Sequence, residues 1–141
     1  MLAAIEQFTS DETAVALELV DLALGNPQQS DYRILIAEAG DQVIGYVCFG
    51  PTPMTLGTYD LYWIASASDQ RTLGVGTQLL VAMEQELLAR EARLIRVETS
   101  SQEHYGKTRA FYEKHRYLET ARIPDFYRPG DDLITLTKRL R

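Results

Sequence analysis

The sequence has a single cysteine, Cys48, among its 141 residues. One cysteine cannot form a disulfide within the chain, which favours a protein of the reducing cytoplasm. The sequence also lacks a run of about 20 apolar residues, the length that a membrane-spanning helix needs. Its first residues, Met1 to Glu6, lack the basic start and the long apolar segment of a secretory signal. We therefore expect a cytoplasmic protein that makes no use of a membrane.

Positive charge and histidine are also in short supply. Lys and Arg number 14 against 20 Asp and Glu, which gives a net charge of -6. A nucleic-acid footprint needs clustered Lys and Arg, so no nucleic-acid partner is predicted. The two histidines, His104 and His115, fall at opposite ends of one predicted helix, about 16 Å apart by helical rise. That is too far for them to share a metal, and no metal site is predicted.

The length fits a single domain, residues 1–141, with 45% apolar residues, as in an ordinary globular protein. A capping box at Thr9–Glu12 opens a first predicted helix. Apolar periodicity then predicts strands at 32–38, 42–49, 59–66, 94–98, 117–123 and 133–137, and helices at about 76–90 and 105–115. This mixed order predicts an α/β (α+β) domain, in which a mixed, mostly antiparallel sheet has helices on both faces.

Two segments rich in proline and glycine are predicted to be loops. Gly50–Pro53 has two prolines, which cannot continue a sheet. Pro124–Asp132 joins the last two predicted strands, and loops between rigid elements commonly carry specificity. Aspartates there could hold an ammonium group and Arg128 a carboxylate, which would suit a small amino-acid-like metabolite. The alternative is an ordinary turn, because Pro, Gly and Asp are turn residues anyway.

The strongest chemical signal is a glycine-rich segment between a strand and a helix, Arg71–Thr77. Backbone N–H groups at a helix start are unpaired, and the helix dipole adds positive charge, so such a turn suits a phosphate or diphosphate. A Walker-type loop would need Lys after Gly76, and the dinucleotide fingerprint would need glycine in place of Leu79. The alternative is a helix whose first turn carries incidental glycines.

The wider sequence resembles the Gcn5-related N-acetyltransferase (GNAT) family. Arg71-x-x-Gly74-x-Gly76 matches its Gln/Arg-x-x-Gly-x-Gly/Ala motif, and Ala110–Lys114 looks like its Phe-Tyr-Glu-Lys helix motif. The resemblance runs from about Ser10 to the C-terminus. It implies the acyl-CoA N-acyltransferase fold, acetyl-CoA as co-substrate, and an enzyme that acetylates a primary amine of a small molecule or peptide by direct attack.

The resemblance also implies roles for individual residues. The family's oxyanion donor is a backbone N–H of a splayed central strand, and the tyrosine that maps to Tyr112 meets the leaving thiolate. Tyr105, Thr108 and Tyr112 share one helical face, so they could line the thioester end. Without the resemblance, Tyr112 would be an ordinary core aromatic. The residues implied in cofactor binding are Ile64, Ala65, Ser66, Arg71, Thr72, Leu73, Gly74, Val75, Gly76, Thr77, Tyr105 and Thr108.

For the general base, the sequence offers two candidate carboxylates. Glu98 ends a predicted strand next to where the sheet should open, and Asp60 lies on the neighbouring strand. Either carboxylate could act through water, or Glu98 could simply be solvated or pair with an arginine. The alternative function is a non-catalytic acyl-CoA-binding sensor or interaction module. Tyr112 together with a usable base distinguishes the two.

The sequence departs from the family at three places. Tyr105 stands where the family often has Asn, and Arg116 stands where it has Gly. A left-handed residue other than glycine costs about 1 kcal/mol, so we expect the turn at Arg116 to differ. The family's first strand has no counterpart, which implies a trimmed domain or a start upstream of Met1. The exposed edge at 32–38 would then be covered by the N-terminal segment or paired in a homodimer.

Overall fold

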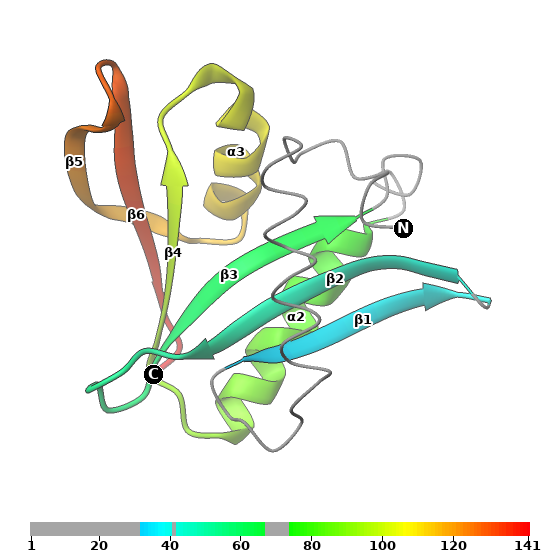
Figure 1. Ribbon diagram of the computed structural model, residues 1–141. Helices are drawn as coiled ribbons and strands as arrows, with labels where there is room; N and C mark the ends of the chain where they lie inside the picture. The colour runs from blue at the N-terminus through cyan, green and yellow to red at the C-terminus, as the bar shows by residue number, and fades with distance from the viewer. Residues whose placement is uncertain (1–31, 41, 67–73) are drawn as a thin grey trace.

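The computed structural model describes residues 32–40, 42–66 and 74–141 (Figure 1). They form one six-stranded sheet in the order β1-β2-β3-β4-β6-β5 with two α-helices. None of the described helices is long and apolar enough to cross a membrane. The elements are β1 (Arg33–Ala39), β2 (Gln42–Pro51), β3 (Thr58–Ser66), α2 (Val75–Ala89), β4 (Leu94–Ser100), η3 (Glu103–Tyr105), α3 (Gly106–Lys114), β5 (Leu118–Arg128) and β6 (Asp131–Arg139).

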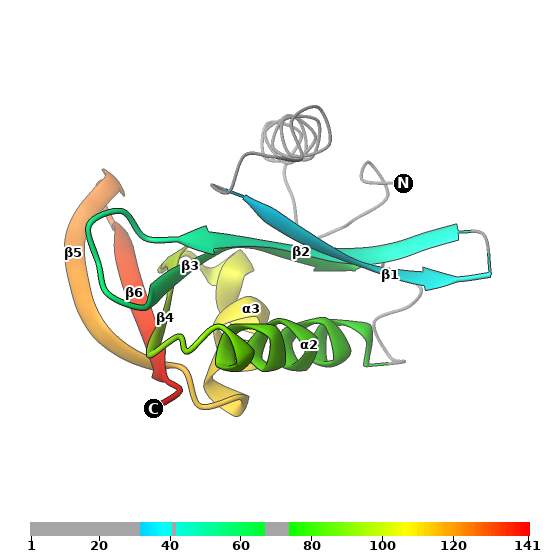
Figure 2. The same cartoon turned by 90° about the horizontal axis from the view of Figure 1, so that it is seen from below.

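The sheet is mixed and mostly antiparallel, as predicted. β3 and β4 pair in parallel, and the other four pairs are antiparallel. Figure 2 shows α2 and α3 on the same side of the sheet. The helix predicted after Thr9 lies outside the described residues. β1 is an edge strand, and its pairing in a homodimer stays a prediction.

The main core lies between the sheet and the two helices. α2 buries Leu79, Leu80, Met83 and Leu87, the four apolar residues whose helical spacing predicted its inner face. They pack with strand residues of the same cluster, such as Phe49.

Cys48 lies in a second, smaller cluster with Tyr46 and Ala65. It is fully buried, and burial raises the pKa of its thiol to about 12. The thiol therefore stays protonated and serves packing, as its place in an apolar run predicted.

The structure corrects both loop predictions. β2 continues through Gly50 to Pro51, which pairs with Tyr59. Pro51 is the last residue of its strand, where the missing N–H interrupts no further ladder. The segment predicted as a nine-residue loop, 124–132, belongs instead to a hairpin whose turn is Pro129–Gly130.

The hairpin keeps its strands paired despite Pro124. The β5–β6 register shifts between Ile123 and Arg128, and Asp125 has a positive φ of 56° within that bulge. The Asp125 carboxylate accepts the Gly130 N–H at 2.7 Å, which closes the turn. A bulge takes up the irregular residues without ending the strands, so loop-like composition misled the prediction.

The turn after α3 also differs from expectation. Arg116 adopts the left-handed conformation, with a φ of 72°. The N–H of Tyr117 bonds to the Tyr112 carbonyl, and the N–H of Arg116 bonds to the Glu113 carbonyl, both at 3.0 Å. This is the Schellman arrangement that usually ends on glycine. The expected change of turn is wrong: the turn is kept, and Arg116 carries the strain.

Candidate active site

The sheet opens between β3 and β4. Their parallel pairing joins Thr58–Asp60 to Leu94–Arg96, and beyond it the two strands diverge (Figure 1). β3 also contains a bulge, because Cys48 of β2 pairs with Trp63 and Phe49 pairs with Leu61. Tyr62 is thus an extra residue on β3. A bulge bends and twists its strand, which accounts for the divergence from β4.

A small cavity of about 70 Å³ lies at this opening. On this measure a single water needs about 10–15 Å³, so the cavity has room for the few atoms at the reacting end of a thioester. It joins three segments that are distant in the sequence: β3, β4, and the run from η3 into α3. The lining residues are Tyr62, Trp63, Ile64, Val97, Glu98, Thr99, Tyr105, Thr108 and Tyr112.

Five of these lining residues are ones that the sequence singled out: Ile64, Glu98, Tyr105, Thr108 and Tyr112. The structure thus brings together the backbone donor candidate, the carboxylate and the hydroxyl-bearing helix face. Of the other four, Tyr62 and Trp63 lie at the bulge of β3, which cannot be read from composition, and Val97 and Thr99 are the neighbours of Glu98 on β4. Ala65 and Ser66 follow Ile64 as buried residues at the end of β3.

Tyr112 is both a core residue and a cavity residue. It is 3% exposed, and its ring lies 5.6 Å from that of Tyr117 and 5.5 Å from that of Phe111. Its hydroxyl makes no hydrogen bond within the described ranges 32–40, 42–66 and 74–141. Burial raises the pKa of Tyr112 well above its usual value. The phenol is therefore protonated at neutral pH and can act as a hydrogen donor.

Glu98 is the charged residue of the cavity lining. Its neighbours Val97 and Thr99 are buried, whereas Glu98 is exposed. Successive side chains of a strand point to opposite faces, so Glu98 faces away from the helix-covered side. Asp60, the other candidate base, accepts a hydrogen bond from Arg96 at 2.7 Å and forms an ion pair with it. Glu98 is thus the better-placed carboxylate.

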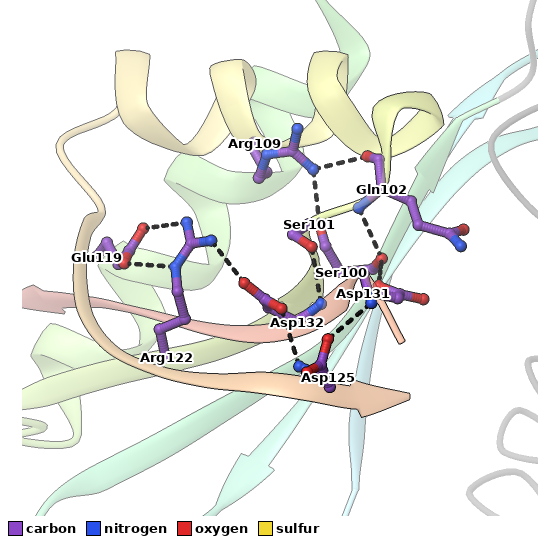
Figure 3. A network of polar contacts seen from close by, with 10 residues as sticks. Ser100, Ser101, Gln102, Arg109, Glu119, Arg122, Asp125, Asp131 and Asp132 are labelled. Atoms are coloured by element: carbon purple, nitrogen blue, oxygen red, sulfur yellow. Dashed lines mark hydrogen bonds and ion pairs between the residues drawn. The ribbon is translucent and has the colours of Figure 1, made fainter. Parts of the chain in front are cut away.

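Arg109 fixes the corner between β4 and α3. Its guanidinium donates to the carbonyl of Ser100 at 2.7 Å and to that of Gln102 at 2.9 Å (Figure 3). A single planar group therefore holds the strand end and the η3 entry together, which places Tyr105 beside the cavity. No residue pattern indicates this role, because its acceptors are backbone carbonyls, which every residue has.

The hairpin carboxylates proposed for the acceptor are engaged within the protein (Figure 3). Asp132 accepts the Arg122 guanidinium and the Asp125 N–H, each at 2.9 Å. Asp131 is buried and accepts the Ser100 hydroxyl. Arg128 lies 4.0 Å from Asp131. The contact with Ser100 joins the hairpin to β4 and the others lie within the hairpin, so they favour the structural alternative for this segment.

The first turn of α2 has the backbone geometry that suits an anion. Gly74 is its N-cap in the left-handed conformation, with a φ of 74°, and the described first turn carries no acidic side chain. Val75 is buried beneath the turn. A Cβ on Gly76 would lie 3.4 Å from the Phe111 ring, so glycine lets α3 pack closely. Arg71, Thr72 and Leu73, the start of the predicted motif, lie outside the described residues.

In the part of the chain that the structure describes, no group of three or more His, Cys, Asp or Glu could hold a metal ion. A family model for the acetyltransferase (GNAT) domain matches residues 30–117, more than half of the chain. The chain belongs to the GNAT family of acetyltransferases. Its sheet and helices form the acyl-CoA N-acyltransferase fold that the motifs predicted.

Solved structures of GNAT proteins resemble this chain along most of its length. One assigned to the family, from Desulfovibrio desulfuricans, is 38% identical with a TM-score of 0.94, covering 99% of this chain and 88% of that one. An aminoglycoside 6'-N-acetyltransferase with coenzyme A is 18% identical with a TM-score of 0.71, covering 97% of both chains. A ribosomal-protein-alanine N-acetyltransferase from Brucella melitensis is 19% identical with a TM-score of 0.68, covering 91% and 78%. No curated protein matches the sequence.

Proposed function

We propose that this GNAT protein transfers the acetyl group of acetyl-CoA to a primary amine of a small molecule or peptide by direct attack. The observation that supports this best is the cavity between β3 and β4, which Ile64, Glu98 and Tyr112 line together. Direct transfer needs no metal and no protein nucleophile. It needs positioning, a donor to the oxyanion, a base and an acid.

Each of these residues has one role in the proposal. Glu98 takes the proton of the acceptor ammonium, through water, from the face away from the helices. The amine nitrogen then bonds to the acetyl carbonyl carbon, and the backbone N–H groups near Ile64 stabilise the oxyanion. When the carbon–sulfur bond breaks, Tyr112 donates its proton to the coenzyme A thiolate, and the second proton of the attacking nitrogen passes through water to the Tyr112 phenolate. The Tyr112 phenol is protonated at neutral pH, so it has a proton to donate.

The first turn of α2 supplies the cofactor site in this proposal. Its backbone N–H groups point at the diphosphate of coenzyme A, and the helix dipole adds to the attraction. Structures of other GNAT proteins hold coenzyme A or acetyl-CoA. The cytoplasm, where acetyl-CoA and reduced thiols coexist, is the location that we propose, in keeping with the lone buried Cys48.

Binding of acetyl-CoA is the first test. We expect a dissociation constant in the micromolar range, about -8 kcal/mol, and a higher melting temperature with the ligand present. Gly74→Glu should abolish binding, because its carboxylate would occupy the anion site. Gly74→Gln is the matched control: it brings the same backbone strain and size without the charge. Equal binding by Gly74→Glu and the unaltered protein would refute this site.

Turnover is the second test, because binding alone would also suit an acyl-CoA-binding module. A panel of primary amines, including an aminoglycoside and a peptide with N-terminal alanine, is screened for thiol release from acetyl-CoA. We expect release that depends on one class of amine. Binding of acetyl-CoA without thiol release for any amine would favour the binding module.

A further inference from the structure

The side of α3 that faces α2 holds the anion-binding turn through two side chains. The Phe111 ring packs on Gly76, and the His115 Nε2 lies 3.1 Å from the Thr77 Oγ1. The Phe111 and His115 rings are themselves in edge contact, with centroids 4.9 Å apart. Gly76 and Thr77 both belong to the first turn of α2. His115 thus contacts the turn directly.

We propose that His115 is a positioning residue for this turn and couples cofactor binding to proton uptake. The inference rests on the proposed function, because it takes the first turn of α2 as the diphosphate site. Protonated, His115 donates from Nε2 to Thr77 and brings a positive charge next to the bound anion. Neutral, it keeps the contact but adds no charge.

The surroundings of His115 shift its pKa in opposite directions in the free protein and in the complex. Without an anion, the positive end of the α2 dipole opposes a proton on His115. Burial lowers the pKa of His115 below its usual value, and the nearby Lys114 and Lys138 lower it further. Glu84 of α2 opposes this, but its carboxylate already accepts Lys138 at 3.0 Å and the Tyr117 hydroxyl at 2.7 Å. A bound diphosphate reverses the balance and favours the protonated ring.

Linkage then fixes the direction of the pH effect. A complex in which the pKa of His115 is higher than in the free protein binds its ligand more tightly as pH falls between the two values. The unaltered protein should therefore take up part of a proton on binding. We expect its affinity to rise by about 5-fold from pH 8 to pH 6, at the low end of typical couplings.

The experiment uses dephospho-coenzyme A, because the 3'-phosphate of coenzyme A titrates near pH 6 and would mask the effect. Calorimetry in buffers of different ionisation enthalpy gives the affinity and the proton uptake together. His115→Gln retains a donor toward Thr77, so it should bind at pH 8 like the unaltered protein but lose the pH dependence. His104→Gln removes the other histidine, which is exposed on η3, and should retain the dependence.

Thr77→Val tests the contact itself: KM for acetyl-CoA should rise while kcat stays the same, because the turn and not the chemistry is disturbed. Tight binding with the same pH dependence in His115→Gln would overturn the inference. So would binding by the unaltered protein with no proton uptake, which would leave the proposed cofactor site intact. No binding at any pH would instead overturn the proposed function, and this inference with it.

Discussion

The α2–α3 pair and β5, the outer strand of the β5–β6 hairpin, are held to the sheet by different forces. Tyr112 and Tyr117 are buried with the inner face of α2 in one apolar cluster. By contrast, every residue of β5 is exposed. Its Arg122 instead donates to Asp132 at the start of β6, and next to it Asp131 accepts the Ser100 hydroxyl of β4 (Figure 3). Apolar burial leaves a periodic pattern in the sequence, whereas an exposed edge strand such as β5, with polar contacts near its turn, has the composition of a loop.

The largest effect should follow a change on the buried side. Tyr112→Phe removes one hydroxyl and little volume from a residue that is 3% exposed. We expect kcat to fall by about 10²- to 10⁴-fold, as for other general acids, with cofactor binding and melting temperature nearly unchanged. Steady-state kinetics beside thermal unfolding measures both. A fully active Phe variant would show that Tyr112 serves only to pack the core.

A smaller loss of activity should follow Glu98→Gln, because a base that acts through water is more easily replaced by solvent. We expect kcat to fall by about 10²-fold, at the lower end of the range for general bases. Asp60→Asn is the matched control, since the Asp60 carboxylate pairs with Arg96 and does not line the cavity. Equal losses of kcat in the two variants would show that Glu98 has no special role.

A change in the hairpin should lower the free energy of unfolding and leave kcat nearly unchanged. Asp131 is buried, and its carboxylate accepts the Ser100 hydroxyl. Asp131→Ala leaves that hydroxyl without its partner, which should lower the free energy of unfolding by about 1–3 kcal/mol. Denaturant unfolding measures the loss, and Asp131→Asn, whose amide oxygen can still accept the Ser100 hydroxyl, should lose less. A fall in kcat as large as that of Tyr112→Phe would contradict the division between the two regions.

The sequence predicted most of the fold and five of the nine cavity residues, for reasons that are local. Leu79, Leu80, Met83 and Leu87 repeat at helical spacing, and Tyr105, Thr108 and Tyr112 fall on one face of a short helix, so neither set needs knowledge of distant contacts. The bulge at Tyr62 and the reach of Arg109 to two carbonyls depend on how separate segments meet. The hairpin was misread because Pro124 and Gly130 have the composition of a loop.

A modest gain in stability should come from the turn that links the two regions. Arg116 is left-handed with an exposed side chain, and that conformation strains any residue except glycine. Glycine relieves the strain but adds freedom to the unfolded chain, so Arg116→Gly should raise the free energy of unfolding by about 0.5–1 kcal/mol. Arg116→Ala keeps the strain and should give no gain. Destabilisation by glycine would show that the Arg116 side chain matters more than its backbone.

The smallest effect should come from the exposed Arg122, and it should depend on pH and salt. Arg122 pairs with Glu119 at 3.0 Å and with Asp132 at 2.9 Å. The Arg122 guanidinium lowers the pKa of Glu119, and the Asp125 N–H, followed by Arg122, lowers the pKa of Asp132. Lowered carboxyl pKa values contribute stability above the unfolded values of about 4, which is lost as pH falls through the folded values. Arg122→Gln should therefore lower the melting temperature slightly at pH 7 and not at pH 2, and 1 M salt should shrink the difference. A difference of the same size at pH 2 would mean that Arg122 acts by packing and not by charge.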